Sequence, residues 1–432
     1  MLFFKSIYSL GVKMYNTRTK NPSEYQVIIA IDWADQKHDL RILKDCEEEC
    51  KVISSDLLTL KNFFDTLILE TVNGSIAIVI ESCQSALMNL LISFTEFDIY
   101  VVHPTTASKF AKTFHLSGAK SDRADTKSLL ELYLKHPDKV QKVDSSFSKG
   151  KLKRLNIKRR DLVDDRTRLT NQLIALLKIY YPNALKVVGN HLYADMFLDF
   201  LDKYPSPQDV INAHQIGITK FFNKRSTNHS KTKERVQILR SSVIVVNDEG
   251  ELDYYIFEIQ QFCHRIRSLN KVIKAYDEKI EQAYRSNEDY EMFQSFPGAG
   301  PSIGPRLMAF FGDDRDKFKS VNEVLKISEI APVTIQSGKM NIVRRRFLCD
   351  RFTQLSFVEF ANNSIRSSIW AHEFYYHKKA LNIPHFTILR ALAYKWIRIM
   401  YRCWKTRTPY NEKTYLEVLE RRRPAWFQKF VN

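Results

Sequence analysis

The chain of 432 residues is 44% hydrophobic and 12% aromatic, which excludes a disordered or fibrous protein and allows several buried cores. Its 66 Lys and Arg against 49 Asp and Glu give a formal net charge of +17. Apolar runs stay well short of the roughly 18 residues that a membrane-spanning helix needs. The six cysteines show neither a paired framework nor zinc-ligand spacing, so we expect reduced thiols in a cytoplasmic protein.

Residues 25–145 alternate between strand and helix signals. Short β-branched or alternating runs predict four strands, at Val27–Trp33, His38–Leu43, Ser75–Glu81 and Phe97–His103. Amphipathic stretches predict helices at Ser85–Thr95 and Ala124–Lys135, the second closed by Pro137. This order predicts an α/β fold in which helices pack on a mixed sheet.

Residues 146–290 carry heptad repeats. A first series of leucines recurs every seven residues, at Leu155, Leu162, Leu169 and Leu176. A longer segment has a series at Leu252, Ile259, Ile266, Ile273 and Ile280, with a companion series at Tyr255, Phe262, Leu269, Tyr276 and Ala283. Repeats sustained over this length predict a coiled coil or a long antiparallel helix pair, formed either within one protomer or between protomers.

Residues 291–432 begin with a glycine-rich turn and end in a basic helix. The backbone N–H groups around Gly298 and Gly300 suit a phosphate, although a plain tight turn explains the same residues. Residues 388–404 predict a helix with one apolar face, and its other face carries Lys395, Arg398, Arg402 and Lys405. That face is either simply solvated or contacts the backbone of DNA or RNA.

The positive charge is concentrated near the C-terminus. Residues 301–432 hold 24 Lys and Arg against 11 Asp and Glu, a surplus of 13 of the total +17. A basic surplus interleaved with Trp and Tyr is typical of nucleic-acid binders. An anionic membrane surface is the alternative, but no lipidation motif or amphipathic anchor supports it.

Four acidic residues fall at the ends of predicted elements. Asp32 and Glu81 end two strands, where βαβ sheets form their functional edge, and Asp122 and Asp125 share one face at a helix start. Converging carboxylates repel one another unless divalent cations neutralise them, and oxygen ligands suit Mg²⁺ or Mn²⁺. The alternative is that Asp122 and Asp125 only complement the helix dipole and that Glu81 faces water. We expect Asp35 and Asp39 at the surface.

Several segments resemble one known family. The stretches IAIDWADQKHDL, IVIES and GAKSDRADTKSLLEL are similar to the N-terminal half of the IS110 (DEDD) insertion-sequence transposases, which include the pilin-gene invertase. The stretches PGAGPSIGPRLMAFFGDDRDKFKSVNEVLKISEIAPVTIQSGK, RSSIWAHEFYYHKK and RALAYKWIRIMYRCWKTRTPY resemble the second conserved unit of that family. The likeness covers roughly residues 25–415. The chain departs from the commoner form after its Gln-Ser-Gly stretch, where Lys339-Met340-Asn341 leads into Arg344-Arg345-Arg346.

The resemblance implies a domain order and a set of site residues. An N-terminal extension (1–24) would precede an RNase H-like, RuvC-like DEDD catalytic domain (25–145), a coiled-coil helical domain (146–290) and a mostly helical transposase domain with the catalytic serine and a basic surface (291–432). Asp32, Glu81, Asp122 and Asp125 would bind Mg²⁺ or Mn²⁺, and Ser337 would be the nucleophile. From the residues alone, Ser337 in Gln-Ser-Gly is ordinary turn chemistry. Candidate nucleic-acid contacts are Gly298, Gly300, Lys339, Arg344, Arg345, Arg346, Lys395, Arg398 and Arg402.

The resemblance also implies an activity and its partners. A recombinase of this family moves its own element: its serine forms a covalent link to DNA, while the acidic domain of another subunit completes the site. A structured bridge RNA selects target and donor DNA, and dimers would assemble into tetramers in the bacterial cytoplasm, at the nucleoid. The alternatives are a Mg²⁺-dependent nuclease of the Holliday-junction type without a covalent serine intermediate, and a non-catalytic DNA- or RNA-binding protein.

Overall fold

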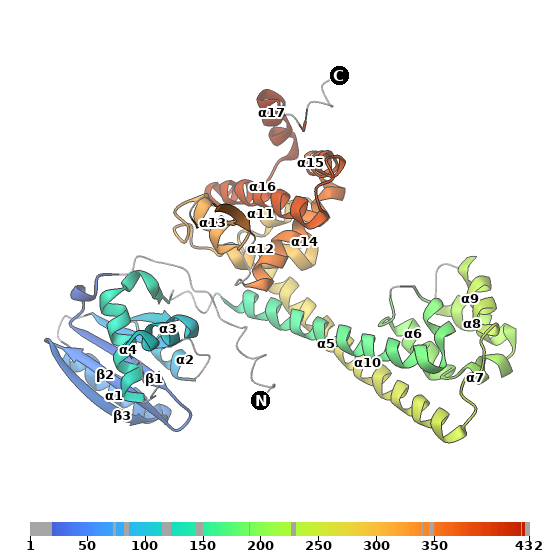
Figure 1. The fold of residues 1–432 in the computed structure, drawn as a ribbon, viewed down its shortest axis with the longest axis horizontal. Helices are drawn as coiled ribbons and strands as arrows, with labels where there is room; N and C mark the ends of the chain where they lie inside the picture. The colour runs from blue at the N-terminus through green and yellow to red at the C-terminus, as the bar shows by residue number, and fades with distance from the viewer. Residues whose placement is uncertain are drawn as a thin grey trace. The chain divides into compact units, whose positions relative to one another are not determined.

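The computed structural model describes residues 20–71, 75–81, 86–114, 122–143, 150–189, 191–225, 230–337, 340–344, 350–424 and 426–427. The chain forms two compact units, shown in Figure 1. The sheet unit comprises residues 1–150 with 314–324, and the helical unit comprises residues 151–313 with 325–432. Within the described ranges, no helix combines the length and the apolar character needed to cross a membrane.

The sheet unit is built on a mixed sheet. Its described part has six strands in the order β3-β2-β1-β4-β5-β6, with β1, β4 and β5 parallel and the other pairs antiparallel. The strands are β1 (Val27–Trp33), β2 (Lys37–Lys44), β3 (Glu47–Ser54), β4 (Ile76–Glu81), β5 (Phe97–Val102) and β6 (Gln141–Lys142). The prediction of an α/β fold with a mixed sheet is therefore confirmed.

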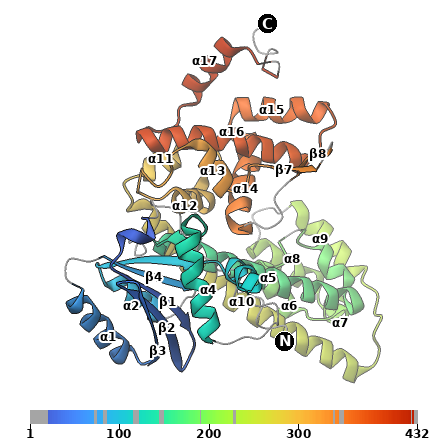
Figure 2. The same ribbon diagram turned by 60° about the vertical axis from the view of Figure 1, so that its left-hand side comes forward.

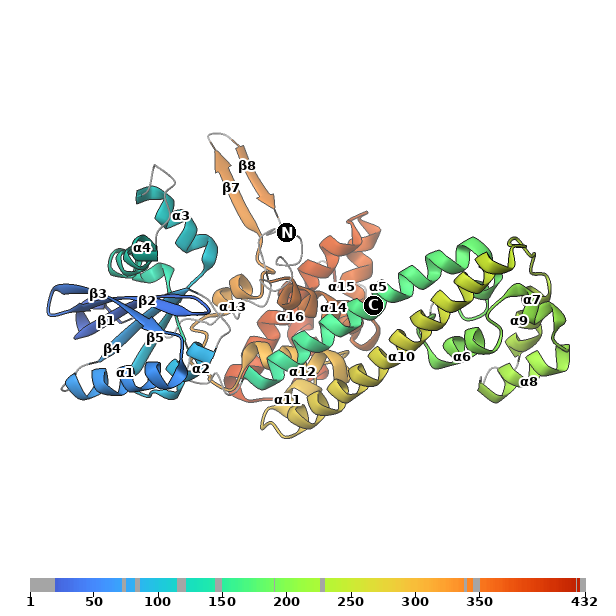
Figure 3. The ribbon, with the colours of Figure 1, turned by 90° about the horizontal axis from the view of Figure 1, so that it is seen from below.

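Helices cover both faces of this sheet. On one face, α1 (Leu57–Glu70) and α2 (Ala86–Ser93) pack against the odd-numbered residues of β1, such as Ile29 and Ile31. On the other face, α3 (Pro104–Phe114) and α4 (Asp122–Lys135) pack against the even-numbered residues, such as Ile28 and Ala30. Figure 3 shows the strands between these two helical layers. Burial on both faces explains why β1 is a continuous apolar run rather than an alternating one.

The helical unit contains a long stalk. Its two helices, α5 (Lys151–Tyr180) and α10 (Glu249–Arg285), run antiparallel within one chain: Tyr180 stacks on Tyr255 at one end, and Arg166 Nη1 donates to Asn270 Oδ1 at 3.0 Å further along. The second heptad series forms the buried seam, with Ile259, Ile266, Ile273 and Ile280 all buried. Of the two arrangements that the heptads allowed, the structure therefore contains an antiparallel pair within one protomer.

A helical cap joins the two stalk helices. It consists of α6 (Asp195–Lys203), α7 (Pro207–Asn212), α8 (Gln215–Arg225) and α9 (Ser230–Arg240). Its aromatic core surrounds Phe200, which is fully buried and lies 5.7 Å from the ring centre of Phe222. The same core includes Leu173 and Leu177 of α5, so cap and stalk share one hydrophobic cluster.

The C-terminal part of the helical unit is a helical module around a tryptophan. Trp396 is fully buried, packs on Phe360 and Trp370, and donates from Nε1 to Ser364 Oγ at 2.8 Å. Figure 2 shows the helices of this module, with α15 (Ile369–Ala380) beside α16 (His385–Thr406). The elements from residue 290 onward are α11 (Tyr290–Gln294), α12 (Gly300–Phe311), α13 (Val321–Ile327), β7 (Val333–Ser337), β8 (Met340–Arg344), α14 (Arg351–Ser367), α15 (Ile369–Ala380), α16 (His385–Thr406) and α17 (Glu412–Arg422).

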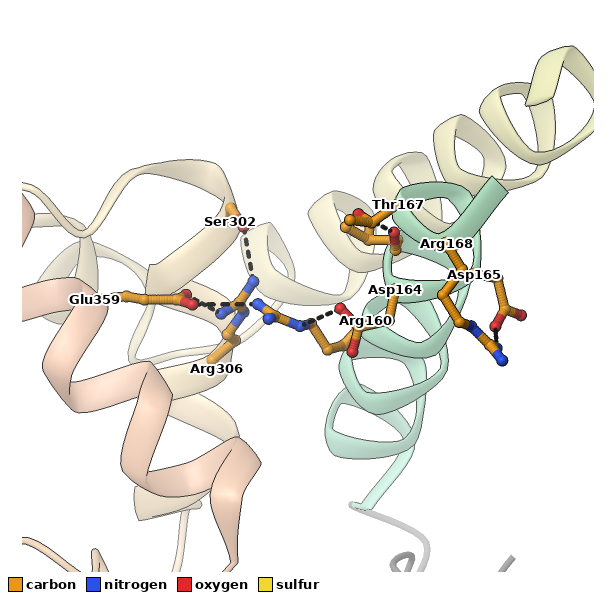
Figure 4. Close-up of polar contacts among 9 residues, drawn as sticks. Arg160, Asp164, Asp165, Thr167, Arg168, Ser302, Arg306 and Glu359 are labelled. Atoms are coloured by element: carbon orange, nitrogen blue, oxygen red, sulfur yellow. Dashed lines mark hydrogen bonds and ion pairs between the residues drawn. The ribbon is translucent and has the colours of Figure 1, made fainter. Parts of the chain in front are cut away.

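An ion cluster ties this module to the stalk. Glu359 on α14 accepts from Arg306 Nη1 of α12 at 2.6 Å and from Arg160 Nη1 of α5 at 3.1 Å (Figure 4). The Arg306 side chain is only 7% exposed, and burial lowers the pKa of its guanidinium. Because a buried guanidinium needs a carboxylate to offset its lost hydration, Glu359 holds three helices together.

We predict that Glu359→Ala destabilises the protein by about 3 kcal/mol, because it leaves the buried Arg306 charge without its carboxylate. Urea unfolding of the full chain measures this change. The matched control is Asp165→Ala, which removes an exposed pair with Arg168 on α5 and should cost less than about 1 kcal/mol. Equal stability of the two variants would contradict the assignment of Glu359 as the junction between module and stalk.

Candidate active site and nucleic-acid interface

Two of the candidate carboxylates lie at the C-terminal ends of neighbouring parallel strands. In the register of β1 and β4, Ile31 is paired with Ile80, so Asp32 and Glu81 follow side by side. Neighbouring strands lie about 4.8 Å apart, which brings the two backbone positions close together. Both side chains are half-buried. The predicted strand-end positions of Asp32 and Glu81 are confirmed.

Both carboxylates lie on the face that α4 covers. Side chains alternate along a strand, and Ile28 and Ala30 of β1, like Ala77 and Val79 of β4, pack in the cluster that includes Leu129 and Tyr133 of α4. Two residues further along each strand, Asp32 and Glu81 have the same orientation as these residues. The alternation therefore directs both of them to the side of the sheet that carries α4.

The other two candidates lie in the first turn of α4. Asp122 is the first residue of the helix, and Asp125, one turn on, is half-buried. The carbonyl of Arg123 between them accepts from Thr126 Oγ1 at 3.1 Å and from Arg41 Nη2 of β2 at 3.1 Å. This second bond connects the turn to the sheet on the same face as Asp32.

Asp32 and Glu81 thus lie on the face of the sheet that α4 covers, and the first turn of α4 contains Asp122 and Asp125. The side chain of Asp122 lies outside the described residues. Among the side chains that the structure does describe, no three of His, Cys, Asp or Glu are close enough to hold a metal ion. The donor chemistry nevertheless fits Mg²⁺, since it consists of hard carboxylate oxygens.

Asp39 is more buried than its place in the sequence predicts. Asp39 was expected at the surface, yet its side chain is only 13% exposed. It is paired across the ladder with Asp32, and residues directly opposite in an antiparallel pair point to the same side of the sheet. The alternation in Lys37–Lys44, with buried His38, Leu40 and Ile42 on the other face, contains the signal that would have placed Asp39 and Arg41 on the α4 side. Asp35 is exposed, as expected.

The candidate nucleophile lies in a two-stranded hairpin. Ser337 is the last residue of β7 and is paired with Met340 at the start of β8. Its side chain lies outside the described residues, as do Lys339, Arg345 and Arg346. Arg344, at the end of β8, is exposed. The hairpin position fits the turn chemistry of the sequence, and the nucleophilic role of Ser337 stays a prediction.

The glycine-rich turn before α12 has a structural role. Gly298 has a φ of +86°, and a Cβ atom there would lie 2.9 Å from the backbone of Asn363 and Ser364 in α14. Glycine is therefore required both for the turn and for the close approach of α14. Gly300, with a φ of +51°, has open space where a Cβ would lie. Phosphate binding at this turn stays a prediction.

The basic face of α16 is divided. Leu389, Leu392, Trp396, Met400 and Cys403 are buried, as the helical spacing predicts. Lys395, expected on the solvated face, is instead half-buried, with its Nζ 5.1 Å from the ring centres of Phe374 and Trp426. Burial, with Lys378 and Arg398 nearby, lowers the pKa of its ammonium. Its ammonium therefore forms cation–π contacts with two rings, which the polar pattern of the sequence did not indicate. Arg398 and Arg402 are exposed.

We predict that neutralising Arg398 and Arg402 to Gln weakens DNA and RNA binding whatever the sequence, because each arginine would release phosphate counterions. The slope of log Kd against log salt concentration should become shallower by about 1.4 to 1.8, the change that the loss of two phosphate contacts produces. Lys271→Gln with Lys274→Gln, two exposed lysines of α10, gives the same charge change as a control. A slope equal to that of this control would mean that the α16 face is only solvated.

Two family models match this chain. A family model described as a transposase of the DEDD type of IS110 matches residues 29–182, and one described as the transposase of the IS116/IS110/IS902 family matches residues 290–376. The first covers the four acidic residues, and the second covers the hairpin that carries Ser337.

Relatives from three insertion elements extend the match. A mini-circle protein of Streptomyces coelicolor, named as a candidate transposase for IS117, is 25% identical over 405 residues, which span 90% of this chain and 96% of the relative. A 44.8 kDa protein of IS116 from Streptomyces clavuligerus is 24% identical over 58% of this chain and 62% of its own length. A 42 kDa protein of IS900 from Mycobacterium paratuberculosis is 23% identical over 61% of this chain and 66% of its own length. With two family models matching in the expected order, the chain belongs to the IS110 family of insertion-sequence transposases and is a DNA transposase.

Proposed function

We propose that this transposase cleaves and rejoins DNA strands with Ser337 as the nucleophile and with a Mg²⁺-binding site formed by Asp32, Glu81, Asp122 and Asp125. The observation that carries the proposal is the register of β1 and β4, which sets Asp32 beside Glu81 under the helix that begins with Asp122. Carboxylates that converge at one site repel one another, and a bound divalent cation would offset that repulsion. The Asp pair is therefore better explained as a ligand pair than as a helix-dipole complement alone.

An RNase H-like fold is the architecture we propose for the sheet unit. In its support, β1, β2 and β3 form an antiparallel meander, and the parallel strands β4 and β5 extend the sheet on the other side of β1. Asp32 is the penultimate residue of the central strand β1, and the neighbouring strand β4 ends in Glu81. Acidic residues at the ends of central strands are where this fold class would carry a metal site.

The four carboxylates would hold one or two divalent cations. When bound, such ions supply positive charge to a scissile phosphate and to the oxygen that leaves it. The protein's own contribution is placement: β1 and β4 fix two ligands by backbone register, and the first turn of α4 brings two more. Water reaches these ligands only in part, because the side chains of Asp32, Glu81 and Asp125 are half-buried. The attraction between their carboxylates and a cation would therefore be less screened than at the surface.

The chemistry that we propose for Ser337 conserves the phosphodiester. The serine oxygen attacks phosphorus, a P–O bond to serine forms as the P–O bond to the sugar oxygen breaks, and the serine proton ends on that departing oxygen. The product is a phosphoserine–DNA diester and a free sugar hydroxyl. The reverse attack by a sugar hydroxyl of another strand would then rejoin DNA without a nucleotide cofactor.

The partners belong to the same proposal. The substrates would be the ends of the element and its target DNA, and a structured RNA from the element would guide their choice. The basic surplus of residues 301–432 supports a nucleic-acid surface. The active form would be a dimer that assembles into a tetramer, in the cytoplasm and at the nucleoid, with the acidic domain of one subunit serving the serine of another.

We predict that Asp32→Ala, Glu81→Ala and Asp125→Ala each abolish strand cleavage while the protein stays folded, since each would remove a metal ligand. Cleavage of an element-end DNA in Mg²⁺ and in EDTA, with thermal melting beside it, measures both effects. Asp35→Ala, at an exposed aspartate three residues after Asp32, is the matched control and should cleave normally. Normal cleavage by Asp32→Ala, or by the wild type in EDTA, would contradict the metal site.

We predict that Ser337→Ala binds DNA and RNA normally but forms no covalent adduct and no recombinants, because the attacking oxygen is gone. A denaturing gel with labelled DNA detects the adduct, and Ser367→Ala, at an exposed serine of α14, serves as control. A mixture of Asp32→Ala and Ser337→Ala proteins should regain activity if the centre forms between subunits. Wild-type recombination by Ser337→Ala would instead favour a metal-dependent junction nuclease.

A further inference from the structure

Arg41 links the sheet to the helix turn that carries two of the carboxylates. It lies on β2, where it is paired with Ala30 of β1, two residues before Asp32. Its Nη2 donates to the Arg123 carbonyl at 3.1 Å, and its Nη1 contacts Glu48 Oε2 of β3 at 2.8 Å. The side chain is 13% exposed. Arg41 is therefore held at both of its terminal Nη nitrogens, by β3 of the sheet on one side and by α4 on the other.

The bond from Arg41 to the Arg123 carbonyl adds a polar link to the sheet at the first turn of α4, ahead of the hydrophobic residues of this helix. The buried hydrophobic residues of α4 run from Leu129 to Tyr133, and the small polar residues Thr126 and Ser128 before them are also buried. The bond from Thr126 to the same carbonyl is internal to the helix and cannot fix the helix against a strand. The Arg41 bond joins the first turn to the sheet, at a backbone atom between Asp122 and Asp125.

We propose that Arg41 is a positioning residue of the carboxylate site, which holds the first turn of α4 in register with the ends of β1 and β4. The inference rests on the proposed function, since it takes the four carboxylates as the metal site. A planar guanidinium suits this task, because it can bind a carboxylate and a carbonyl at the same time in a fixed geometry.

Charge alone makes the opposite prediction, which allows a decisive test. A cation beside the carboxylates repels a divalent ion, so removing Arg41 should tighten metal binding if only its charge mattered. If Arg41 positions the turn, removing it should weaken metal binding, because the ligands no longer meet. Loss of a residue that orients metal ligands typically costs roughly 10–100-fold in affinity or activity.

The experiment uses the full chain with Arg41→Met, which keeps the aliphatic volume, and Arg41→Lys, which keeps the charge and one donor. Mn²⁺ binding is measured directly by electron paramagnetic resonance, and amide hydrogen exchange is followed in the peptide that covers residues 122–130. We expect Arg41→Met to weaken Mn²⁺ binding by roughly 10–100-fold and to speed exchange in this peptide, with Arg41→Lys in between. Glu48→Gln is the matched control: its amide oxygen can still accept from Arg41 and the Arg123 bond stays, so only the charge of the pair is lost, and it should bind Mn²⁺ like the wild type.

The outcomes separate this inference from the proposed function. Mn²⁺ binding by Arg41→Met that is equal to or tighter than wild type would overturn the positioning role, and so would unchanged exchange in residues 122–130. Asp32→Ala is measured beside it: unchanged Mn²⁺ binding in that variant would overturn the metal site itself. If Arg41→Met does not fold, Arg41→Lys decides, since weaker Mn²⁺ binding at a retained charge supports positioning and wild-type binding contradicts it.

Discussion

The parallel register of β1 and β4 is the constraint on which the candidate centre depends. A shift of one residue would turn Asp32 or Glu81 to the opposite face, among Ile31, Ile80 and the helices α1 and α2. That face is dry and apolar, so an ionised carboxylate there would be strongly unfavourable. The apolar runs before Asp32 and Glu81 thus determine where the charges lie. Side chains alternate along a strand, so burial of the isoleucines against α1 and α2 directs Asp32 and Glu81 to the opposite face.

The helical unit relies on one buried charge in a comparable way. Arg306 is held by Glu359, which also pairs with Arg160 of the stalk, so the module that carries the Ser337 hairpin is joined to α5 by ions as well as by apolar packing. A directional contact of this kind fixes orientation more sharply than a hydrophobic surface does. Both units therefore combine an apolar core that gives stability with a few arginine contacts, Arg41 and Arg306, that fix geometry.

The sequence predicted most strands and long helices because their signals are local. The run Val27–Trp33 was predicted at its observed bounds, and the isoleucine heptads of α10 are buried as expected. Strand β3 was missed because Glu47–Ser54 is an exposed, highly charged edge strand that lacks an apolar pattern. Asp32 and Glu81 could be placed from strand ends, whereas Asp39, Arg41 and Lys395 depend on which face a partner element covers. The roles of the carboxylates and of Ser337 came from family resemblance and stay predictions.

The central claim is that the strand-end carboxylates and Ser337 act in one reaction. Its most direct test is to trap the DNA–protein adduct on a denaturing gel, digest it, and identify the DNA-linked peptide by mass spectrometry, with Mg²⁺ and with EDTA. Our account predicts a phosphodiester to Ser337 in Mg²⁺ and no adduct in EDTA. DNA linked to another residue, an adduct formed equally well in EDTA, or cleaved strands with no adduct would contradict it.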